Sequence, residues 1–290
     1  MPRTPSKPTT KALTPQKPAQ VAIAPSLIVV EGNISAGKTT LCEKLGYEME
    51  STKVFKEPVS TNPYLTKFYA EPKKYALIMQ LWLLRQRFET YLEAMRHVAE
   101  TGESVVLDRS LFSDWVFAEK NRLDGNIDEA GFEEYTKLRE EMLSMVPLPS
   151  ALVYLDCPPE ECYKRVHNLR CRVSCSCRRK LQARPPRSLD YTLSPRSPRT
   201  HTTSPPPAPH SARLPQTQDC EGGIPLEYLS GLHDCYKQLV VSMQESATCA
   251  AFSFEWASFG KASAVAKEIA CKGGLAEVDW SSAYNRANTW

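Results

Sequence analysis

One stretch decides the fold of this chain: Glu31-Gly32-Asn33-Ile34-Ser35-Ala36-Gly37-Lys38-Thr39-Thr40. Residues 32–39 match the pattern G-x-x-x-x-G-K-[ST] of a phosphate-binding P-loop. The context that this motif requires is also present, because an apolar β-branched run at 27–30 precedes it and a helix-like run at 41–45 follows it. The motif therefore predicts a strand, a phosphate-binding loop and a helix in direct succession.

The residue types of this loop suit a nucleotide polyphosphate. The two glycines let backbone N–H groups turn toward phosphate oxygens, and the helix N-terminus adds partial positive charge. Lys38 is expected to reach the β- and γ-phosphates, and the Thr39 hydroxyl to hold Mg²⁺. We therefore predict ATP, or another nucleoside triphosphate, together with Mg²⁺. The predicted phosphate-binding residues are Gly32, Asn33, Ile34, Ser35, Ala36, Gly37, Lys38, Thr39 and Thr40.

The charge of the chain is unevenly distributed. Residues 1–26 hold four basic residues and no acid, and residues 173–218 hold eight basic residues and one acid. Because the whole chain has 36 basic and 33 acidic residues, the remainder is acidic, with a net charge near −8. This argues against a nucleic-acid-binding protein. Since no run approaches the ~20 apolar residues of a transmembrane helix, a membrane is not an expected partner either.

Strand-like and helix-like runs alternate along the rest of the chain. Strands are expected at 27–31, 54–58, 104–108, 151–156 and 250–256, and helices at 38–50, 72–100, 110–121, 128–145, 158–169, 224–246 and 261–271. Alternation of apolar strands with helices predicts an α/β fold, a doubly wound parallel sheet of five strands flanked by helices.

Two segments are predicted to be disordered. Residues 1–26 are rich in Pro, Thr and Lys, and residues 173–218 hold nine prolines among 46 residues. Such segments bury too little apolar area to offset their ordering entropy. We therefore expect a tail at 1–26 and one domain at 27–290, interrupted by a Pro/Arg/Ser-rich insert. The tail is Arg-poor and weakly amphipathic, which favours a cytoplasmic protein; the alternative is a transit peptide to mitochondria or plastids.

Several motifs, in the right order, resemble the cellular deoxynucleoside kinases. They are EGNISAGKTT at 31–40, KEPV at 56–59, NPYLTKFYAEPKKYA at 62–76, Gln80, DRSLFSD at 108–114 and IPLEYLSGLHDCY at 224–236. The resemblance covers 27–172 and 219–260 and implies a P-loop kinase fold. It also implies transfer of the γ-phosphoryl group of ATP, or another NTP, to the 5′-hydroxyl of a deoxynucleoside. A homodimer formed through the helices at 72–100 and 128–145 is a further implication.

The resemblance assigns roles to single residues. Glu57 matches the base that takes the 5′-hydroxyl proton, and Arg109 matches the arginine that pairs with it; with Lys38 they form the predicted catalytic set. Asp108 stands where the family often has Glu, beside the expected Mg²⁺, and its shorter side chain reaches less far toward the metal. Tyr69 matches the tyrosine that binds the sugar 3′-hydroxyl.

A second group implies the choice of base. Gln80 matches the glutamine that pairs with the base edge, and Arg87 lies two helical turns further on, on the same side. Together with Asp114 they resemble members that accept purines or cytosine, whereas an ordinary surface charge pair is the alternative. A buried Arg–Asp pair leaves no space for a thymine methyl group. Phe117 is expected to stack on the base, although the family phenylalanine falls one residue later, at Ala118.

The lid of the family departs from its usual sequence here. The pattern R-x-R-x-x-E is restored when Arg172 is joined directly to Asp219. Arg170 and Arg172 would then bind phosphates, and Glu221 would meet the 3′-hydroxyl. Residues 173–218 begin with Val-Ser and end with Gln, which codons of the form GTN-AGY and CAG can encode. We therefore interpret the insert as a retained in-frame intron, with a genuine additional loop as the alternative.

Two other functions stay open at this point. A split lid favours a catalytically impaired splice form, or a non-catalytic structural relative, because fold alone does not fix function. The complete set of Lys38, Thr39, Glu57 and Arg109 favours an enzyme. A nucleoside-monophosphate kinase ranks third, since Tyr69, Gln80 and Glu221 suit a substrate without a 5′-phosphate.

Overall fold

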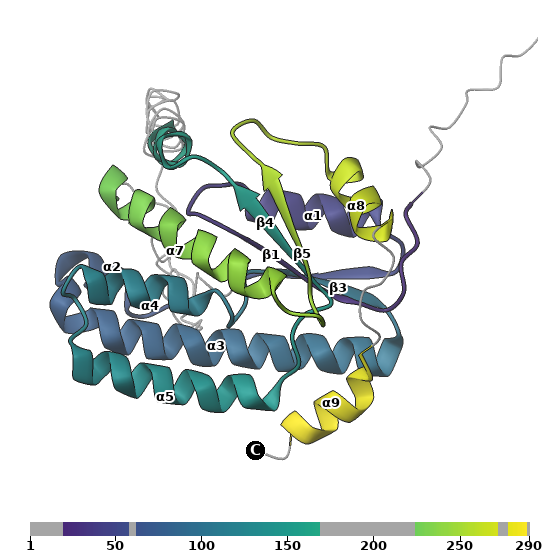
Figure 1. The fold of residues 1–290 in the computed structure, drawn as a ribbon, viewed down its shortest axis with the longest axis horizontal. Coiled ribbons are helices and arrows are strands. Elements are labelled where there is room, and N and C mark those ends of the chain that lie inside the picture. The colour runs from purple at the N-terminus through teal and green to yellow at the C-terminus, as the bar shows by residue number, and fades with distance from the viewer. Residues whose placement is uncertain (1–19, 58–61, 169–223, 272–277, 289–290) are drawn as a thin grey trace, which may run out of the picture.

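The computed structural model describes residues 20–57, 62–168, 224–271 and 278–288 (Figure 1). Its centre is one sheet with the strand order β2-β3-β1-β4-β5, and all four pairings are parallel. The strands are β1 (Leu27–Gly32), β2 (Thr52–Phe55), β3 (Ser104–Asp108), β4 (Ala151–Asp156) and β5 (Ala250–Glu255). The predicted doubly wound, five-stranded parallel sheet is confirmed.

Strand β1 lies in the middle of the sheet and is buried over its whole length. Side chains of a strand alternate between the two faces of a sheet. Leu27 and Val29 accordingly enter the core on one face, and Ile28 and Val30 enter the core on the other. A strand covered on both faces has no polar side, which explains why its sequence is continuously apolar.

Helices cover both faces of this sheet (Figure 1). On one face lie α1 (Lys38–Glu48), α8 (Ala262–Cys271) and a helix at 159–168. On the other face lie α3 (Pro72–Thr101), α4 (Asp114–Leu123) and α7 (Leu226–Gln244), with α5 (Glu129–Met145) packed on the outside of α3 and α4. Of the helices described, none is long and apolar enough to cross a membrane.

Helix α3 carries two predicted site residues into the molecule. Pro72 opens the helix, and Gly102 ends it with a φ of 70°, a left-handed conformation that glycine adopts at low cost. Its buried face continues through Gln80 and Arg87 as well as through apolar residues such as Leu84. Two polar side chains therefore point inward from an otherwise apolar stripe, where only internal partners can satisfy them.

Two predicted boundaries were wrong at the edge of the sheet where the strands end. The second strand was expected to run to residue 58 but ends at Phe55, so Glu57 lies in the connection beyond the strand. The fourth helix was expected from residue 110 but begins at Asp114. The reason is a turn at 109–113, in which the Ser110 hydroxyl accepts from the backbone N–H of Phe112 at 3.2 Å and so competes with helical hydrogen bonds.

Two described helices were not predicted, and part of the expected tail packs on the domain. They are α2 (Leu65–Ala70) and α9 (Trp280–Ala287), each shorter than the run that helical periodicity needs. Asp279 caps α9 by accepting from the backbone N–H of Ser282. Residues 20–26 are described, and Val21 pairs with Met49 at the end of α1. Residues 1–19 and the insert at 173–218 lie outside the described residues.

Trp280 on α9 offers a test of this helix. Its side chain is 5 % exposed and packs in the core cluster formed with α3 and α5. Helix α9 lies at the C-terminal end of α3 (Figure 1), whereas Gln80 belongs to the N-terminal third of that helix. We expect Trp280→Ala to lower the free energy of unfolding by about 3 kcal/mol, because α9 would lose its anchor on α3. Urea unfolding measures this loss, and the turnover number of the folded protein should stay unchanged. A fall in turnover without loss of stability would contradict this reading.

Candidate active site

The P-loop has the backbone that its sequence predicts. Gly32, Ser35 and Gly37 all have positive φ values, of 150°, 58° and 104°. A side chain at Gly32 would also press to 3.0 Å from the carbonyl oxygen of Leu155, so the position requires glycine. No side chain caps the N-terminus of α1. The first N–H groups of α1 are therefore available to an anion.

Lys38 is held inside this loop. Its side chain is buried, and its Nζ donates to the carbonyl oxygen of Asn33 at 2.7 Å. Burial lowers the pKa of Lys38 to about 8, with Arg109 contributing in the same direction. A polyphosphate that displaces this carbonyl would stabilise the positive charge of the lysine, so Lys38 is positioned for an anionic ligand.

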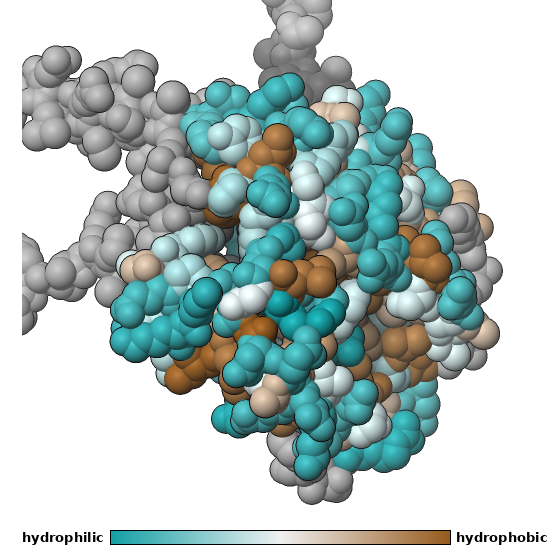
Figure 2. All heavy atoms as spheres, turned by 60° about the vertical axis from the view of Figure 1, so that its left-hand side comes forward, coloured by the Kyte–Doolittle hydropathy of each residue, from teal (hydrophilic) through white to brown (hydrophobic). Residues whose placement is uncertain are grey.

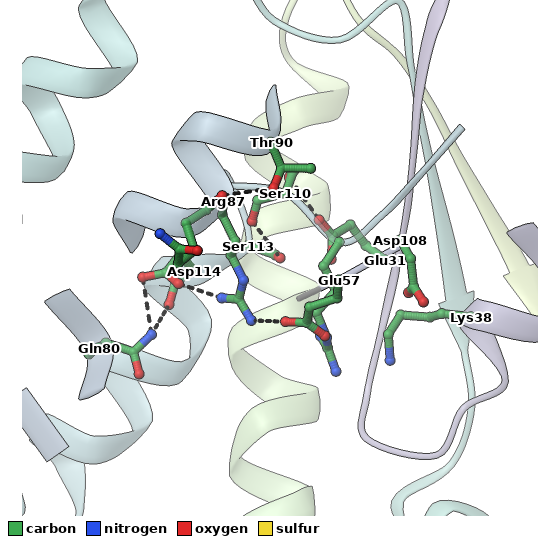
Figure 3. Close-up of polar contacts among 12 residues, drawn as sticks. Glu31, Lys38, Glu57, Gln80, Arg87, Thr90, Asp108, Ser110, Ser113 and Asp114 are labelled. Carbon is green, nitrogen blue, oxygen red and sulfur yellow. Dashed lines mark hydrogen bonds and ion pairs between the residues drawn. The ribbon is translucent and has the colours of Figure 1, made fainter. Parts of the chain in front are cut away.

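A buried chain of charges lies next to the P-loop (Figure 3). The guanidinium of Arg87 binds Glu57 through Nη2, at 2.5 Å from Oε1, and Asp114 through Nη1. The Arg87 side chain is 5 % exposed and that of Asp114 is 0 % exposed. This excludes the surface charge pair that was the alternative reading, and confirms that the pair is buried. The geometry places one cation between two carboxylates.

Glu57 also accepts from Arg109, whose Nε lies 3.1 Å from Oε2. Burial alone would raise the pKa of Glu57, but the charges of Arg87 and Arg109 outweigh it and hold this pKa below its usual range. Glu57 is therefore ionised at neutral pH. It points into a pocket, and an ionised carboxylate there can accept a proton from a bound hydroxyl group.

The strained turn after β3 holds Arg109 in place. Its backbone N–H donates to Val30 at 3.1 Å, and its Nη1 donates to the carbonyl oxygen of Gly32 at 3.1 Å and to the hydroxyl of Tyr236. Neighbouring β1 thus fixes both the backbone and the side chain of this arginine. Tyr236, on α7, was missed by the sequence analysis because a tyrosine at helical spacing looks like an ordinary core residue.

The residues predicted to bind Mg²⁺ meet at the ends of β3 and the P-loop. The Thr39 hydroxyl donates to Oδ2 of Asp108 at 2.5 Å. The other carboxylate oxygen, Oδ1, is buried and has no hydrogen-bond partner among the described residues. A hydroxyl and a carboxylate beside a phosphate site are ligands that Mg²⁺ prefers, so the two residues fit this ion.

A pocket opens beside this chain of charges. It is lined by Ile34, Glu57, Asn62, Leu65, Phe68, Tyr69, Met79, Gln80, Leu83, Arg87, Arg109, Phe117 and Tyr228. The pocket brings together four residues predicted for the substrate, Tyr69, Gln80, Arg87 and Phe117, while Asp114 lies behind Gln80 and Arg87. Figure 2, turned so that the left-hand side of Figure 1 comes forward, shows a mostly hydrophilic surface with small, separate apolar patches.

Phe117, not Ala118, faces the pocket. Ala118, the next residue of α4, is fully buried in the core. The guanidinium carbons of Arg109 and Arg87 lie 4.8 Å and 5.4 Å from the centre of the Phe117 ring. These contacts help to hold both arginines in place. Stacking of this ring on a base stays a prediction, as do the lid roles of Arg170, Arg172 and Glu221, which lie outside the described residues.

Arg165, another residue that the sequence analysis missed, ties the P-loop to the segment after β5. Its Nη1 donates to the carbonyl oxygen of Ala36 at 2.9 Å, and its Nη2 donates to that of Ala257 at 2.7 Å. Its guanidinium lies 4.2 Å from the ring of Phe259, which packs against Gly37. An aromatic ring that is 61 % exposed therefore stands directly beside the phosphate-binding loop.

Comparison with known proteins identifies the family. The model of the family described as deoxynucleoside kinase matches residues 28–174, and a deoxyguanosine kinase of Dictyostelium discoideum is 39 % identical over 84 % of this chain and 68 % of its own length. The chain belongs to the deoxynucleoside kinase family. Among solved structures, a deoxyadenosine kinase from M. mycoides with bound dATP has a TM-score of 0.57 at 19 % identity, covering 84 % of this chain and 97 % of that one. That likeness supports the fold.

Membership of this family confirms two predictions: the P-loop kinase fold and the deoxynucleoside kinase activity. The matches also include a relative with another name, subunit 10 of the NADH dehydrogenase 1 alpha subcomplex from Bos taurus. It is 33 % identical over 48 % of this chain and 47 % of its own length.

Glu31 is a buried acid that the sequence analysis assigned no role. Its side chain is fully buried on β1, Oε1 accepts from the Ser110 hydroxyl at 2.8 Å, and Oε2 has no partner among the described residues. Burial raises the pKa of Glu31 to about 7, although Arg109 and the hydroxyls of Ser113 and Ser110 act against it. The folded protein therefore binds this proton more tightly than the unfolded chain does.

This shift predicts a pH-dependent effect of Glu31→Gln. A raised pKa contributes stability below pH 4.5 that is lost as the pH rises through 7. Glutamine imitates the protonated acid. As the pH rises from 5 to 8, the free energy of unfolding of the variant should therefore increase relative to that of the wild type, by on the order of 3 kcal/mol. Chemical unfolding at both pH values measures the gap. Glu43→Gln, the same substitution at a half-exposed side chain on the surface, is the matched control.

Proposed function

We propose that this deoxynucleoside kinase transfers the γ-phosphoryl group of ATP, or another NTP, to the 5′-hydroxyl of a purine or cytosine deoxynucleoside. The observation that carries the proposal is Glu57, an ionised carboxylate on the wall of the pocket that also contacts the two arginines. A sugar hydroxyl needs a base of this kind as it attacks. The other half of the reaction needs cations around the phosphoryl group, which the P-loop supplies.

Each charged group then has a separate task. Glu57 accepts the proton of the 5′-hydroxyl, while Arg109 orients that carboxylate and faces the reacting oxygen. Lys38 and the N–H groups at the start of α1 bind the transferring phosphoryl group. Thr39 and Asp108 would hold Mg²⁺, which neutralises phosphate charge when bound.

The sugar and the lid complete the site. Tyr69 lines the pocket, in support of its predicted contact with the 3′-hydroxyl. We assign Glu221 to the same hydroxyl, and Arg170 and Arg172 to the phosphates, from the family pattern. The match to the family model ends at residue 174, close to where the 46-residue insert begins, which supports the interpretation of 173–218 as foreign to the lid. A homodimer through α3 and α5, and a cytoplasmic location, remain our predictions.

The base preference follows from the polar groups in the pocket. The Gln80 amide donates to Asp114 and leaves its own oxygen buried and without a partner among the described residues. The Nε of Arg87 is likewise buried and without a described partner. An acceptor and a donor without described partners, on two residues that line the pocket, suit the amino- and oxo-bearing edge of a purine or of cytosine. The deoxyguanosine kinase among the relatives makes deoxyguanosine the first candidate.

A non-catalytic role is the second candidate, because a relative over half of the chain carries the name of an NADH dehydrogenase subunit. The described geometry favours the enzyme. A structural subunit has no physical need for a lysine with a lowered pKa next to an ionised glutamate and two buried arginines. Keeping such charges buried costs stability, a cost that an active site has reason to bear and a structural subunit has not.

Glu57→Gln tests the catalytic proposal. The amide keeps the shape of the side chain but cannot take the proton, so we expect turnover to fall by roughly 10² to 10⁴. Binding of ATP, followed by calorimetry, should stay within a factor of about two, since Lys38 and α1 are untouched. Glu43→Gln serves as the matched control, because Glu43 lies on the surface with Lys56. Near-normal turnover of the Glu57 variant would remove this residue from the mechanism.

Base preference is tested with the four deoxynucleosides. We expect wild-type kcat/KM for deoxyguanosine, deoxyadenosine or deoxycytidine to exceed that for thymidine by at least about tenfold. Replacing Arg87 and Asp114 together by Ala avoids leaving one charge unpaired, and should move the ratio toward thymidine. All rates should fall in that variant, because Glu57 loses one of its two arginines. A wild type that prefers thymidine would overturn the assignment.

A further inference from the structure

The carboxylate of Asp114 is completely buried and accepts from three side chains. Oδ1 accepts from Arg87, and Oδ2 accepts from both the Gln80 amide at 3.0 Å and the Tyr135 hydroxyl at 2.8 Å. Arg87 and Gln80 line the nucleoside pocket, whereas Tyr135 stands behind it on α5 and is not part of its wall. Three helices therefore meet at this one carboxylate.

The hydroxyl of Tyr135 can play only one part in this contact. An ionised carboxylate accepts and does not donate, so the tyrosine donates its proton. Burial raises the pKa of Tyr135 well above its usual value, and the charge of Asp114 adds to this. The hydroxyl therefore stays protonated around neutral pH and is available as a donor to Asp114.

Asp114 decides how Gln80 presents itself to the pocket, and Tyr135 holds one of the two Asp114 oxygens involved. The Gln80 nitrogen lies 3.0 Å from Oδ2 of Asp114 and 3.2 Å from its backbone oxygen, and both of these atoms are acceptors. The amide is therefore fixed with its nitrogen toward Asp114 and its oxygen on the other side. Without the Tyr135 hydroxyl, Oδ2 would lose one of its two donors, and the carboxylate could turn about the bond that joins it to the side chain. The Gln80 nitrogen would keep the backbone oxygen as an acceptor, but the positions of the Gln80 oxygen and of the Arg87 guanidinium in the pocket would be less well defined.

We propose that Tyr135 is a positioning residue for base choice, which acts by fixing the Asp114 carboxylate and through it the amide of Gln80 and the guanidinium of Arg87. The inference rests on the proposed function, in which these three residues recognise the base. Tyr135 itself does not touch the nucleoside. It removes the rotational freedom of the carboxylate that the recognising side chains share, so the pocket keeps its donor and acceptor groups at one set of positions.

The test is Tyr135→Phe, which removes one hydroxyl and keeps the ring. The matched control is Tyr91→Phe, since Tyr91 is also fully buried but donates to the carbonyl oxygen of Pro147. We measure kcat/KM for the preferred deoxynucleoside and for thymidine, KM for ATP, and stability in urea. In the Tyr135 variant the ratio of the two kcat/KM values should fall about tenfold, through a higher KM for the preferred nucleoside, with KM for ATP unchanged. The control should lose similar stability but keep the ratio.

Asp114→Asn separates failure of this inference from failure of the proposed function. If the ratio changes in the Asp114 variant but not in the Tyr135 variant, Tyr135 is a structural residue and the inference is overturned, while base recognition by Asp114 stands. If neither variant changes the ratio, the proposed base site itself is wrong. An equal fall in the ratio for Tyr91→Phe would also overturn the inference, because a general loss of rigidity would then explain the effect.

Discussion

The rest of the site depends on one buried cation, the guanidinium of Arg87. It is shared by Glu57, from the connection after β2, and by Asp114, from the start of α4. Burying a charge is costly, and the cost is offset only if every partner stays in place. The same interaction therefore holds Glu57, the proposed base, and Asp114, the proposed support of base recognition, at a fixed separation. In the proposed mechanism, a nucleoside would lie along this pair in the pocket, with its sugar toward Glu57 and its base toward Gln80 and Arg87.

Parallel strands bring the remaining groups to this point. In the register of the sheet Val30 lies opposite Asp108, so the P-loop after β1 and the turn after β3 leave the same edge side by side. That turn contains Arg109 in a left-handed conformation, which costs about 1–3 kcal/mol for a residue other than glycine. Hydrogen bonds from Arg109 to Val30 and Gly32 offset the strain. In this arrangement the side chain of Arg109 contacts Glu57, and that of the preceding residue, Asp108, contacts Thr39.

The sequence alone predicted those elements and site residues that a local pattern or a contiguous motif encodes. The P-loop, the apolar strands and the long helix α3 follow from spacing, and family motifs carried Glu57, Arg87, Arg109 and Asp114. The residues that were missed act over long sequence separations. Tyr135 and Tyr236 look like core aromatics because their hydroxyl partners lie on other elements, and short helices such as α2 and α9 have too few turns for periodicity. Their roles depend on tertiary packing, which no local pattern records.

The distribution of charge leaves Lys38 as the cation of the site to which a polyphosphate would bind. Arg87 and Arg109 are already neutralised by carboxylates, whereas Lys38, within the part of the chain that is described, has a backbone carbonyl as its hydrogen-bond partner and no carboxylate in ion-pair contact. Its lowered pKa shows that this arrangement favours the charged form less than water does. An arriving phosphate supplies the missing negative charge and repays the desolvation of Lys38 at once. The ion pairs of the two arginines are therefore already formed where the nucleoside is proposed to bind. Lys38, in contrast, gains a negatively charged partner only when a phosphate binds.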